Sequence, residues 1–179
     1  MNVGKILEEQ LCKSIPDYAL IHRLADPAQS FGGGNTRFSA KNPFDFLIWD
    51  SKHYILYAIE AKTVAKKSIS FERTEKDDGV IHFHQIEGLL SWDKYDGIIG
   101  GLIIEFRELE KTIFLNINDM KTLMDKTSKK SFTIDDLDKI GISYFVIPQK
   151  KKRTRYTYDM DLFFSRNDLV GADKERENL

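Results

Sequence analysis

The chain has 179 residues, of which 41% are hydrophobic and 31% charged, and this composition is ordinary for a soluble globular protein with one core. Its formal net charge of −1 excludes a basic surface over the whole molecule, so any nucleic-acid surface must come from local clusters. Cys12 is the single cysteine, which excludes an intrachain disulfide and a multi-cysteine zinc site. We see no apolar run of signal-peptide or membrane-span length and therefore expect a cytoplasmic protein.

The first predicted elements are a helix and a strand. Apolar residues recur at helical spacing from Val3 to Ile15, and Pro16 ends this helix. Glu8 lies beside the apolar stripe, so it either looks inward or is a solvated charge on an amphipathic helix. Periodicity alone favours the solvated charge. The residues from Tyr18 to Leu24 form the first predicted strand.

A polar loop is predicted from Ala25 to Asn42, and it contains the Gly-Gly-Gly run 32–34. Three glycines cannot pack a core, and they let the backbone approach another molecule closely. They do not form a P-loop, because no Gly-Lys-Ser/Thr follows them. Arg37 and Lys41 in this loop are candidate phosphate contacts or merely solvated charges.

Two apolar runs flank a short polar turn between Pro43 and Lys62, which predicts a hairpin of two largely buried strands. Asp45 starts the first strand, whereas Glu60 and Lys62 end the second and share one face. Because the strands are antiparallel, the three side chains can meet at one end of the hairpin. Buried charges need a partner or a metal, so this group predicts a site that holds a divalent cation against a phosphate. The alternative is an edge salt bridge between Glu60 and Lys62.

A second helix is predicted from Ile81 to Asp93, with His82, His84 and Gln85 near its start. A helix N-terminus offers free N–H groups and positive potential, so we expect it to attract phosphate. Zinc at His82 and His84 is a weak alternative, since the sequence shows no third ligand. Capping or surface histidines are the simpler interpretation.

The remaining elements are short and mixed, with no repeat and no second domain. They are the strand Gly97–Phe106, the strand Thr112–Leu115, a helix to Met124 capped by Asn116 or Asn118, a short helix from Thr133 to near Gly141, and the strand Ile142–Ile147. We expect one domain over residues 1–164 and a polar tail over residues 165–179.

Two basic segments are candidate DNA contacts. The first runs from Thr63 to Ser68 and includes Lys66 and Lys67. The second follows Gln149, and its cationic residues are Lys150, Lys151, Lys152, Arg153 and Arg155. Tyr156 and Tyr158 come next, so base or sugar contacts are available there as well as phosphate contacts. The alternative for this segment is a solvated β-turn.

Taken together, these features resemble the PD-(D/E)XK nucleases, and within them the RecU-type Holliday junction resolvases, especially short phage-type members. The resemblance extends from Gly4 to about Asp161. The core acids match as Asp45 and as Glu60-Ala61-Lys62, and the helix acid matches as Glu8. The further matches are Lys67 to Phe71, His84 to Leu89, Gly97 to Phe106 and Lys150 to Tyr156.

The resemblance implies an α/β fold with a restriction-endonuclease-like core, in which helices flank a mixed central β-sheet. It also implies a Mg²⁺-dependent homodimer, with Mn²⁺ as a substitute metal, that resolves four-way DNA junctions by paired symmetric nicks in recombination and repair. Asp45 and Glu60 would bind the metal together with the Ala61 carbonyl, and Glu8 would assist at the edge of the site. Lys62 would orient the attacking water or stabilise the transition state. Gln85 and His84 would lie near the scissile strand.

The sequence departs from this family at one place. Cellular members carry a basic stalk that enters the junction, whereas the corresponding region here is only the loop from Phe31 to Asn42. Two alternatives therefore stay open: a nuclease of the same superfamily for other duplex or damaged DNA, and a non-catalytic DNA-binding protein that uses Lys150 to Arg155. Asp45, Glu60 and Lys62 argue against the second, because a pure DNA-binding protein has no need for buried acids.

Overall fold

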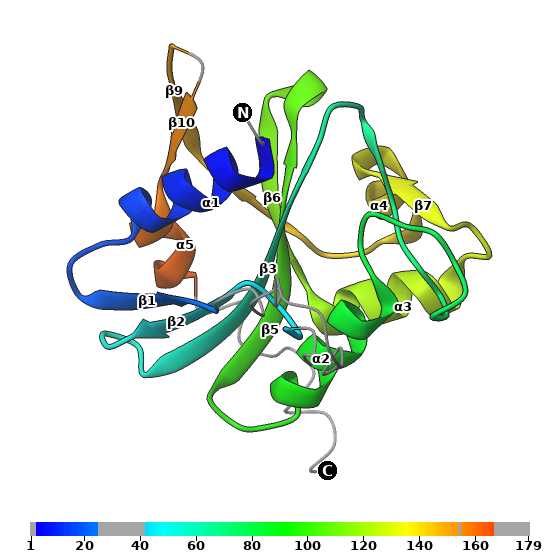
Figure 1. The fold of residues 1–179 in the computed structure, drawn as a ribbon, viewed down its shortest axis with the longest axis horizontal. Coiled ribbons are helices and arrows are strands. Elements are labelled where there is room, and N and C mark those ends of the chain that lie inside the picture. Colours follow the sequence, from blue (N-terminus) through cyan, green and yellow to red (C-terminus); the bar gives the residue numbers. More distant parts are fainter. Residues whose placement is uncertain (1–2, 25–41, 154, 167–179) are drawn as a thin grey trace, which may run out of the picture.

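The computed structural model describes residues 3–24, 42–153 and 155–166 of the chain. A six-stranded sheet forms its centre, and helices lie on both faces of the sheet (Figure 1). The sequence-based predictions for Arg37, Lys41 and the tail beyond Arg166 fall outside the described residues. None of the helices in those residues combines the length and the apolar character needed to cross a membrane.

The order of strands in the central sheet is β1-β2-β3-β5-β6-β8. Their bounds are β1 (Ala19–Arg23), β2 (Phe46–Asp50), β3 (Ile55–Val64), β5 (Ile98–Phe106), β6 (Lys111–Asn116) and β8 (Phe145–Ile147). The β3–β5 pair is parallel and the other neighbours are antiparallel, so the sheet is mixed. Parallel neighbours need a crossover connection, which here includes α2 (Phe83–Asp93).

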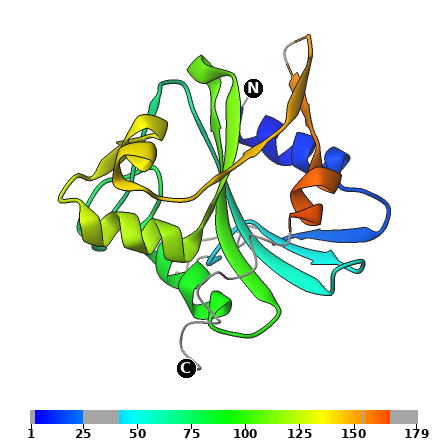
Figure 2. The same ribbon diagram turned by 180° about the vertical axis from the view of Figure 1, so that it is seen from behind.

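Each face of the sheet has its own hydrophobic core. On one face lie α1 (Val3–Ser14) and α5 (Met160–Ser165), beside the hairpin of β9 (Gln149–Lys152) and β10 (Arg155–Tyr158). On the other lie α2, α3 (Ile117–Lys126) and α4 (Ile134–Ile140), with the small ribbon of β4 (Ser68–Ser70) and β7 (Ser131–Thr133). Figures 1 and 2 show this division from front and back.

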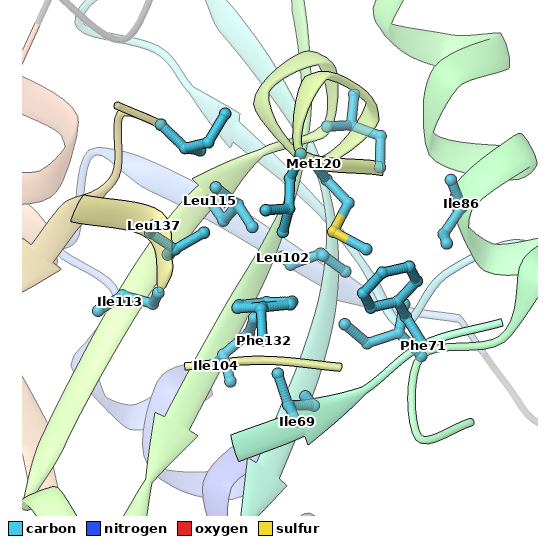
Figure 3. Packing of buried hydrophobic residues seen from close by; sticks show 14 of the residues in the cluster. Ile69, Phe71, Ile86, Leu102, Ile104, Ile113, Leu115, Met120, Phe132 and Leu137 are labelled. Atoms are coloured by element: carbon cyan, nitrogen blue, oxygen red, sulfur yellow. The ribbon is translucent and has the colours of Figure 1, made fainter. Parts of the chain in front are cut away.

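Figure 3 shows the core beneath α3 and α4. Leu102 and Leu115 come from neighbouring strands of the sheet, and Met120 of α3 and Leu137 of α4 belong to the same buried cluster. Phe132 of β7 closes the same cluster. Each large side chain that is fully buried in this way contributes roughly 1.5–3 kcal/mol through the loss of apolar surface to water. This packing makes the sheet a rigid support for the polar residues that β3 and the residue before β2 carry.

The structure confirms the predicted α/β class and the mixed central sheet flanked by helices. It also confirms the short helix that begins after Thr133 and ends at Gly141, whose positive φ of 74° is the left-handed C-cap. The second strand of the hairpin was predicted to end at Lys62, but β3 continues to Val64 because its last residues pair with β5.

Three small parts of the fold were not predicted. These are the β4–β7 ribbon, the β9–β10 hairpin and helix α5. The strands of the ribbon are three residues long, and the two strands pair across more than sixty residues of sequence. Segments so short have too few residues to show an alternation of apolar and polar side chains, so their structure depends on the partner that folding supplies.

Candidate active site

Asp45 lies immediately before β2, where it is held against the neighbouring strand. Its Oδ2 accepts a hydrogen bond from the Ala61 N–H at 2.9 Å, and its own N–H donates to the Ile59 carbonyl at 3.1 Å. The carboxylate is therefore clamped beside β3, directly opposite the Glu60-Ala61-Lys62 segment. The local hairpin brings these residues together because the register pairs Phe46 with Ile59.

Glu60 is the most deeply buried acid of this group, with only 2% of its surface exposed. Its Oε1 accepts a hydrogen bond from Gln85 Nε2 at 2.6 Å and forms an ion pair with Lys62 Nζ at 2.6 Å. Its Oε2 is also buried, yet it has no hydrogen-bond partner within the described residues. A buried carboxylate oxygen without a partner is costly, so this atom is the natural point for a cation to bind.

Burial raises the pKa of Glu60, the charge of Lys62 lowers it in part, the nearby Asp45 carboxylate raises it again, and the net value is about 7. Two carboxylates in one apolar setting repel each other when both are ionised. The site therefore favours neutralisation by a proton or by a bound cation.

The donor set fits a hard divalent cation such as Mg²⁺, which takes oxygen ligands and keeps several waters. Asp45 and Glu60 supply two carboxylates, and Ala61, whose N–H donates to Asp45, directly follows Glu60 in the sequence. No cluster of three or more His, Cys, Asp or Glu with metal-binding geometry occurs among residues 3–24, 42–153 and 155–166. Asp45 and Glu60 suit a metal that is held by two acids and by water.

Gln85 lies in the first turn of α2, and the structure shows which way its amide points. The backbone N–H of His82 donates to Gln85 Oε1 at 3.0 Å, so Nε2 is turned toward Glu60. His84 is half-buried in the same turn, and its ring stacks on that of His82 with centroids 5.5 Å apart. The start of α2 therefore lies beside the acids.

Glu8 belongs to α1, which packs on the opposite face of the sheet from α2. Its Oε2 accepts a hydrogen bond from Arg23 Nε at 2.6 Å. The next residue, Leu24, donates its N–H to the Asp45 carbonyl at 2.8 Å. Glu8 is therefore linked through Arg23 to the Asp45 end of the sheet, although it belongs to the helix of the other face.

The first basic segment continues from the end of β3. Lys66 and Lys67 are exposed there, and Lys67 Nζ lies 3.7 Å from a Glu108 carboxylate oxygen. That distance between two exposed groups is a weak interaction, so both lysines can reach an external phosphate.

The second basic segment is a hairpin rather than a simple turn. Opposed residues of antiparallel strands share a face, and the register pairs Lys152 with Arg155 and Lys150 with Thr157. Lys150, Lys152 and Arg155 therefore share one face of the hairpin. Lys151 lies on the other face, where it pairs with Glu110 and approaches the Tyr156 ring. Lys151 thus already pairs with an acid of the same chain on the surface of the protein.

Sequence reasoning missed one acid near the site, Glu72. It lies in what the sequence shows only as a charged loop, yet it is buried against the start of α2 and contacts His82. No periodicity marks such a residue, since its partner is ten positions away and both are polar.

Comparison with known proteins shows to which family this chain belongs. Residues 2–158 match the family described as RecU, Recombination protein U. The SPbeta prophage-derived uncharacterized protein YotM of Bacillus subtilis (strain 168) is 33% identical over 171 residues, which cover 88% of this chain and 82% of that relative. A solved structure of Hjc, a Holliday junction resolvase from Archaeoglobus fulgidus, is similar with a TM-score of 0.45 and 15% identity, over 74% of this chain and 90% of that one. The chain belongs to the RecU family, as its motifs predicted.

Proposed function

We propose that this protein is a metal-dependent, structure-selective DNA endonuclease that resolves four-way (Holliday) junctions by paired symmetric nicks. Membership of the RecU family supports this proposal. The observation that carries it is the buried, unpartnered Oε2 of Glu60 beside the Asp45 carboxylate and the Lys62 ammonium, within the described residues. A protein that only binds DNA has no use for such a group.

The metal would be Mg²⁺, with Mn²⁺ able to replace it, held by Asp45, by Glu60 and by the Ala61 carbonyl. When bound, such an ion lowers the pKa of a coordinated water and stabilises charge on a phosphate. Asp45 lies immediately before β2, and Glu60 and Ala61 lie on the neighbouring strand β3. The sheet is rigid, so these ligand oxygens would need little reorganisation to bind the ion.

Lys62 supplies a positive charge next to the acids. Its side chain is mostly buried, with 15% exposed, and its Nζ is positioned by Glu60 Oε1. From there it would orient the attacking water or stabilise the charge that develops on the phosphate, as a compact cation does. Gln85 holds Glu60 from the other side, and His84 at the start of α2 would approach the scissile strand. Glu8 would assist from the edge.

DNA would be held mainly through phosphates. The face of the hairpin that carries Lys150, Lys152 and Arg155 is the best candidate surface, together with Arg153 at its turn. Lys66 and Lys67 would extend this surface, and we propose the same role for Arg37 and Lys41 from their sequence. Phosphate contacts supply affinity without shape preference, so they do not explain junction selectivity by themselves.

Paired nicks in a junction with two-fold symmetry need two equivalent active sites. A homodimer with one site per subunit meets this requirement. We therefore expect the protein to sediment as a dimer and to bind one junction per dimer.

A cleavage assay tests the proposal. The protein is incubated in Mg²⁺ with a four-way junction, a duplex and a single strand that share one sequence, and the products are resolved on a denaturing gel. We expect nicks at symmetric positions in two strands of the junction, with little cleavage of the other substrates. Equal cleavage of the duplex would favour a nuclease for other DNA. Binding without cleavage in both Mg²⁺ and Mn²⁺ would favour the non-catalytic alternative.

A further inference from the structure

Glu72 lies in the connection between β4 and α2, and its carboxylate is occupied by the start of that helix. Oε1 accepts a hydrogen bond from His82 Nδ1 at 2.7 Å, and Oε2 accepts the Phe83 N–H at 2.8 Å. Phe83 is the first residue of α2, and its N–H has no acceptor within the helix. Burial by itself would raise the pKa of Glu72, but these hydrogen bonds outweigh burial and the pKa is lowered. Glu72 thus acts as a charged anchor for the first turn.

The backbone on both sides of Glu72 is held in place. Its own N–H donates to the Ile81 carbonyl, and the Phe71 N–H donates to the Lys130 carbonyl, each at 2.9 Å. The guanidinium of Arg73 donates to the Met124 carbonyl at 2.9 Å, at the end of α3. The anchor is therefore part of the packed body of the protein rather than of a loose loop.

The first turn of α2 connects Glu72 to Glu60 through a chain of hydrogen bonds. The His82 N–H can only donate, so it must face the oxygen of the Gln85 amide, and Gln85 Nε2 is then turned to Glu60 Oε1. Oε1 of Glu60 receives both Gln85 and Lys62 and has little capacity left. Of the two Glu60 oxygens, only Oε2 lacks a hydrogen-bond partner within the described residues.

We propose that Glu72 is a positioning residue for the candidate metal site. By holding His82 and Phe83 it fixes the Gln85 amide against Glu60, so that Glu60 offers a single oxygen, Oε2, to the metal. This inference rests on the proposed metal-dependent function. It predicts that loss of Glu72 releases Gln85 and weakens metal binding, although Glu72 touches neither the metal nor the DNA.

The alternative is that Glu72 only stabilises α2, and α4 offers a matched control for it. Thr133 caps α4 by accepting the Asp136 N–H at 3.1 Å. Thr133→Ala should remove a helix cap and destabilise the protein by about 1 kcal/mol, without any contact to the acids. A purely structural role would make Glu72→Ala and Thr133→Ala behave alike at the metal site.

The experiment uses wild type, Glu72→Ala, Glu72→Gln and Thr133→Ala. Nuclear magnetic resonance follows the side-chain NH₂ signals of Gln85 without metal, and electron paramagnetic resonance measures the affinity for Mn²⁺. In Glu72→Ala we expect the Gln85 signals to move to the position of a free amide. We also expect a Mn²⁺ affinity about tenfold lower, as is typical when a group behind a metal ligand is lost.

Glu72→Gln keeps an oxygen for the Phe83 N–H and should restore most of the Gln85 signal position and of the Mn²⁺ affinity. In cleavage assays Glu72→Ala should lower kcat with little change in KM for DNA, whereas Thr133→Ala should change neither. Unmoved Gln85 signals in a folded Glu72→Ala variant would overturn the positioning role. So would an equal loss of Mn²⁺ affinity in Thr133→Ala. If the Gln85 signals move but wild type binds no Mn²⁺, the proposed metal function fails, and so does the role of Glu72 in metal binding.

Discussion

The two oxygens of Glu60 have different surroundings, and this difference defines the candidate active site. Oε1 is held by an amide and an ammonium, whereas Oε2 is buried with no partner among the described residues. Asp45 adds a second carboxylate whose position is clamped by the Ala61 N–H. A bound cation would satisfy both groups at once. The proposed metal-dependent chemistry therefore depends on the negative charges of Asp45 and Glu60.

Removing either charge should stop the reaction. We predict that Asp45→Asn or Glu60→Gln lowers cleavage of a four-way junction by more than about a hundredfold, because a ligand contributes more than the supporting groups behind it. DNA affinity, measured by gel shift in Ca²⁺, should stay near that of wild type. Full activity in either variant, or cleavage that needs no metal, would contradict the proposed site.

A substitution at Gly101 tests how tightly the sheet is packed beneath that site. A Cβ at this position would lie 2.2 Å from an edge carbon of the Phe114 ring, deep in the sheet. We predict that Gly101→Ala destabilises the protein by about 1–3 kcal/mol, the usual range for an overpacked core. Urea unfolding followed by circular dichroism measures the change. Gly88→Ala is not a suitable control, because its Cβ would meet Pro43 at 2.5 Å.

Among the secondary-structure elements, the start of α4 allows a prediction of how the stability of the protein depends on pH. A hydrogen bond from Lys129 and hydrogen bonds from Thr133 lower the pKa of Asp136 to about 2. An acid whose pKa is lower in the folded state stabilises the fold above its unfolded value of about 4, and this stabilisation is lost as pH falls toward about 2.

We therefore predict that Asp136→Asn is less stable than wild type at pH 7 and that the difference shrinks steadily between about pH 4 and pH 2. Urea unfolding at pH 7, 4 and 3 measures it. Asp125→Asn is a control, because Asp125 is an exposed acid in an i,i+4 pair with Lys121. A difference that is the same at all three pH values would mean that the charge of Asp136 does not stabilise α4.

The β9–β10 hairpin makes a prediction about salt. Each phosphate contact contributes roughly 0.9 to the slope of log affinity against log salt concentration, so five contacts would contribute about 4 to 5. Lys151 is already paired with Glu110, which leaves Lys150, Lys152, Arg153 and Arg155 for DNA. We predict that neutralising these four together lowers the slope by roughly 3.6 for every DNA shape.

Lys151→Gln is the matched control for the hairpin, and it should change the slope by much less than one unit. The measurement is fluorescence anisotropy with junction and duplex over a range of salt concentrations. An unchanged slope in the fourfold variant would show that the hairpin does not meet phosphates.

At the scale of the whole molecule, the open question is shape selectivity. Both duplex and junction offer the same backbone charge, so selectivity must come from two active sites at a defined separation and from an element that enters the junction centre. Residues 25–41 stand in the sequence between Leu24, whose N–H donates to the Asp45 carbonyl, and Asn42, which precedes Asp45 by three positions. The predicted loop is therefore close in sequence to the candidate site.

We predict that replacing Phe31 to Phe38 with a short neutral linker lowers the preference for junction over duplex, while Mn²⁺ binding at Asp45 and Glu60 survives. Competition binding in Ca²⁺ measures the preference, and a thermal melt checks the fold. A folded variant that keeps its full preference would assign discrimination to the geometry of the dimer.

The local parts of this protein could be predicted from its amino-acid sequence. The apolar runs around residues 51–53 predict the hairpin, and the hairpin brings Asp45 to Glu60 and Lys62 because only a short turn separates the strands. The cap residues predicted α4 at both ends. These features depend on neighbours along the chain, so their residue patterns are readable without a partner.

Contacts between polar groups that are distant in the sequence could not be predicted, because they form only when the chain folds. Gln85 contacts Glu60 across 25 positions of sequence, and Lys151 contacts Glu110 across 41. Strand β4 pairs with β7, although α2 and α3 lie between them in the sequence. Polar side chains leave no periodic signal, and a short strand has no pattern of its own. Packing of the helices on the sheet leaves a buried group such as Glu60 only the partners that the fold places beside it, whereas the exposed Lys151–Glu110 pair follows from the position of the β9–β10 hairpin.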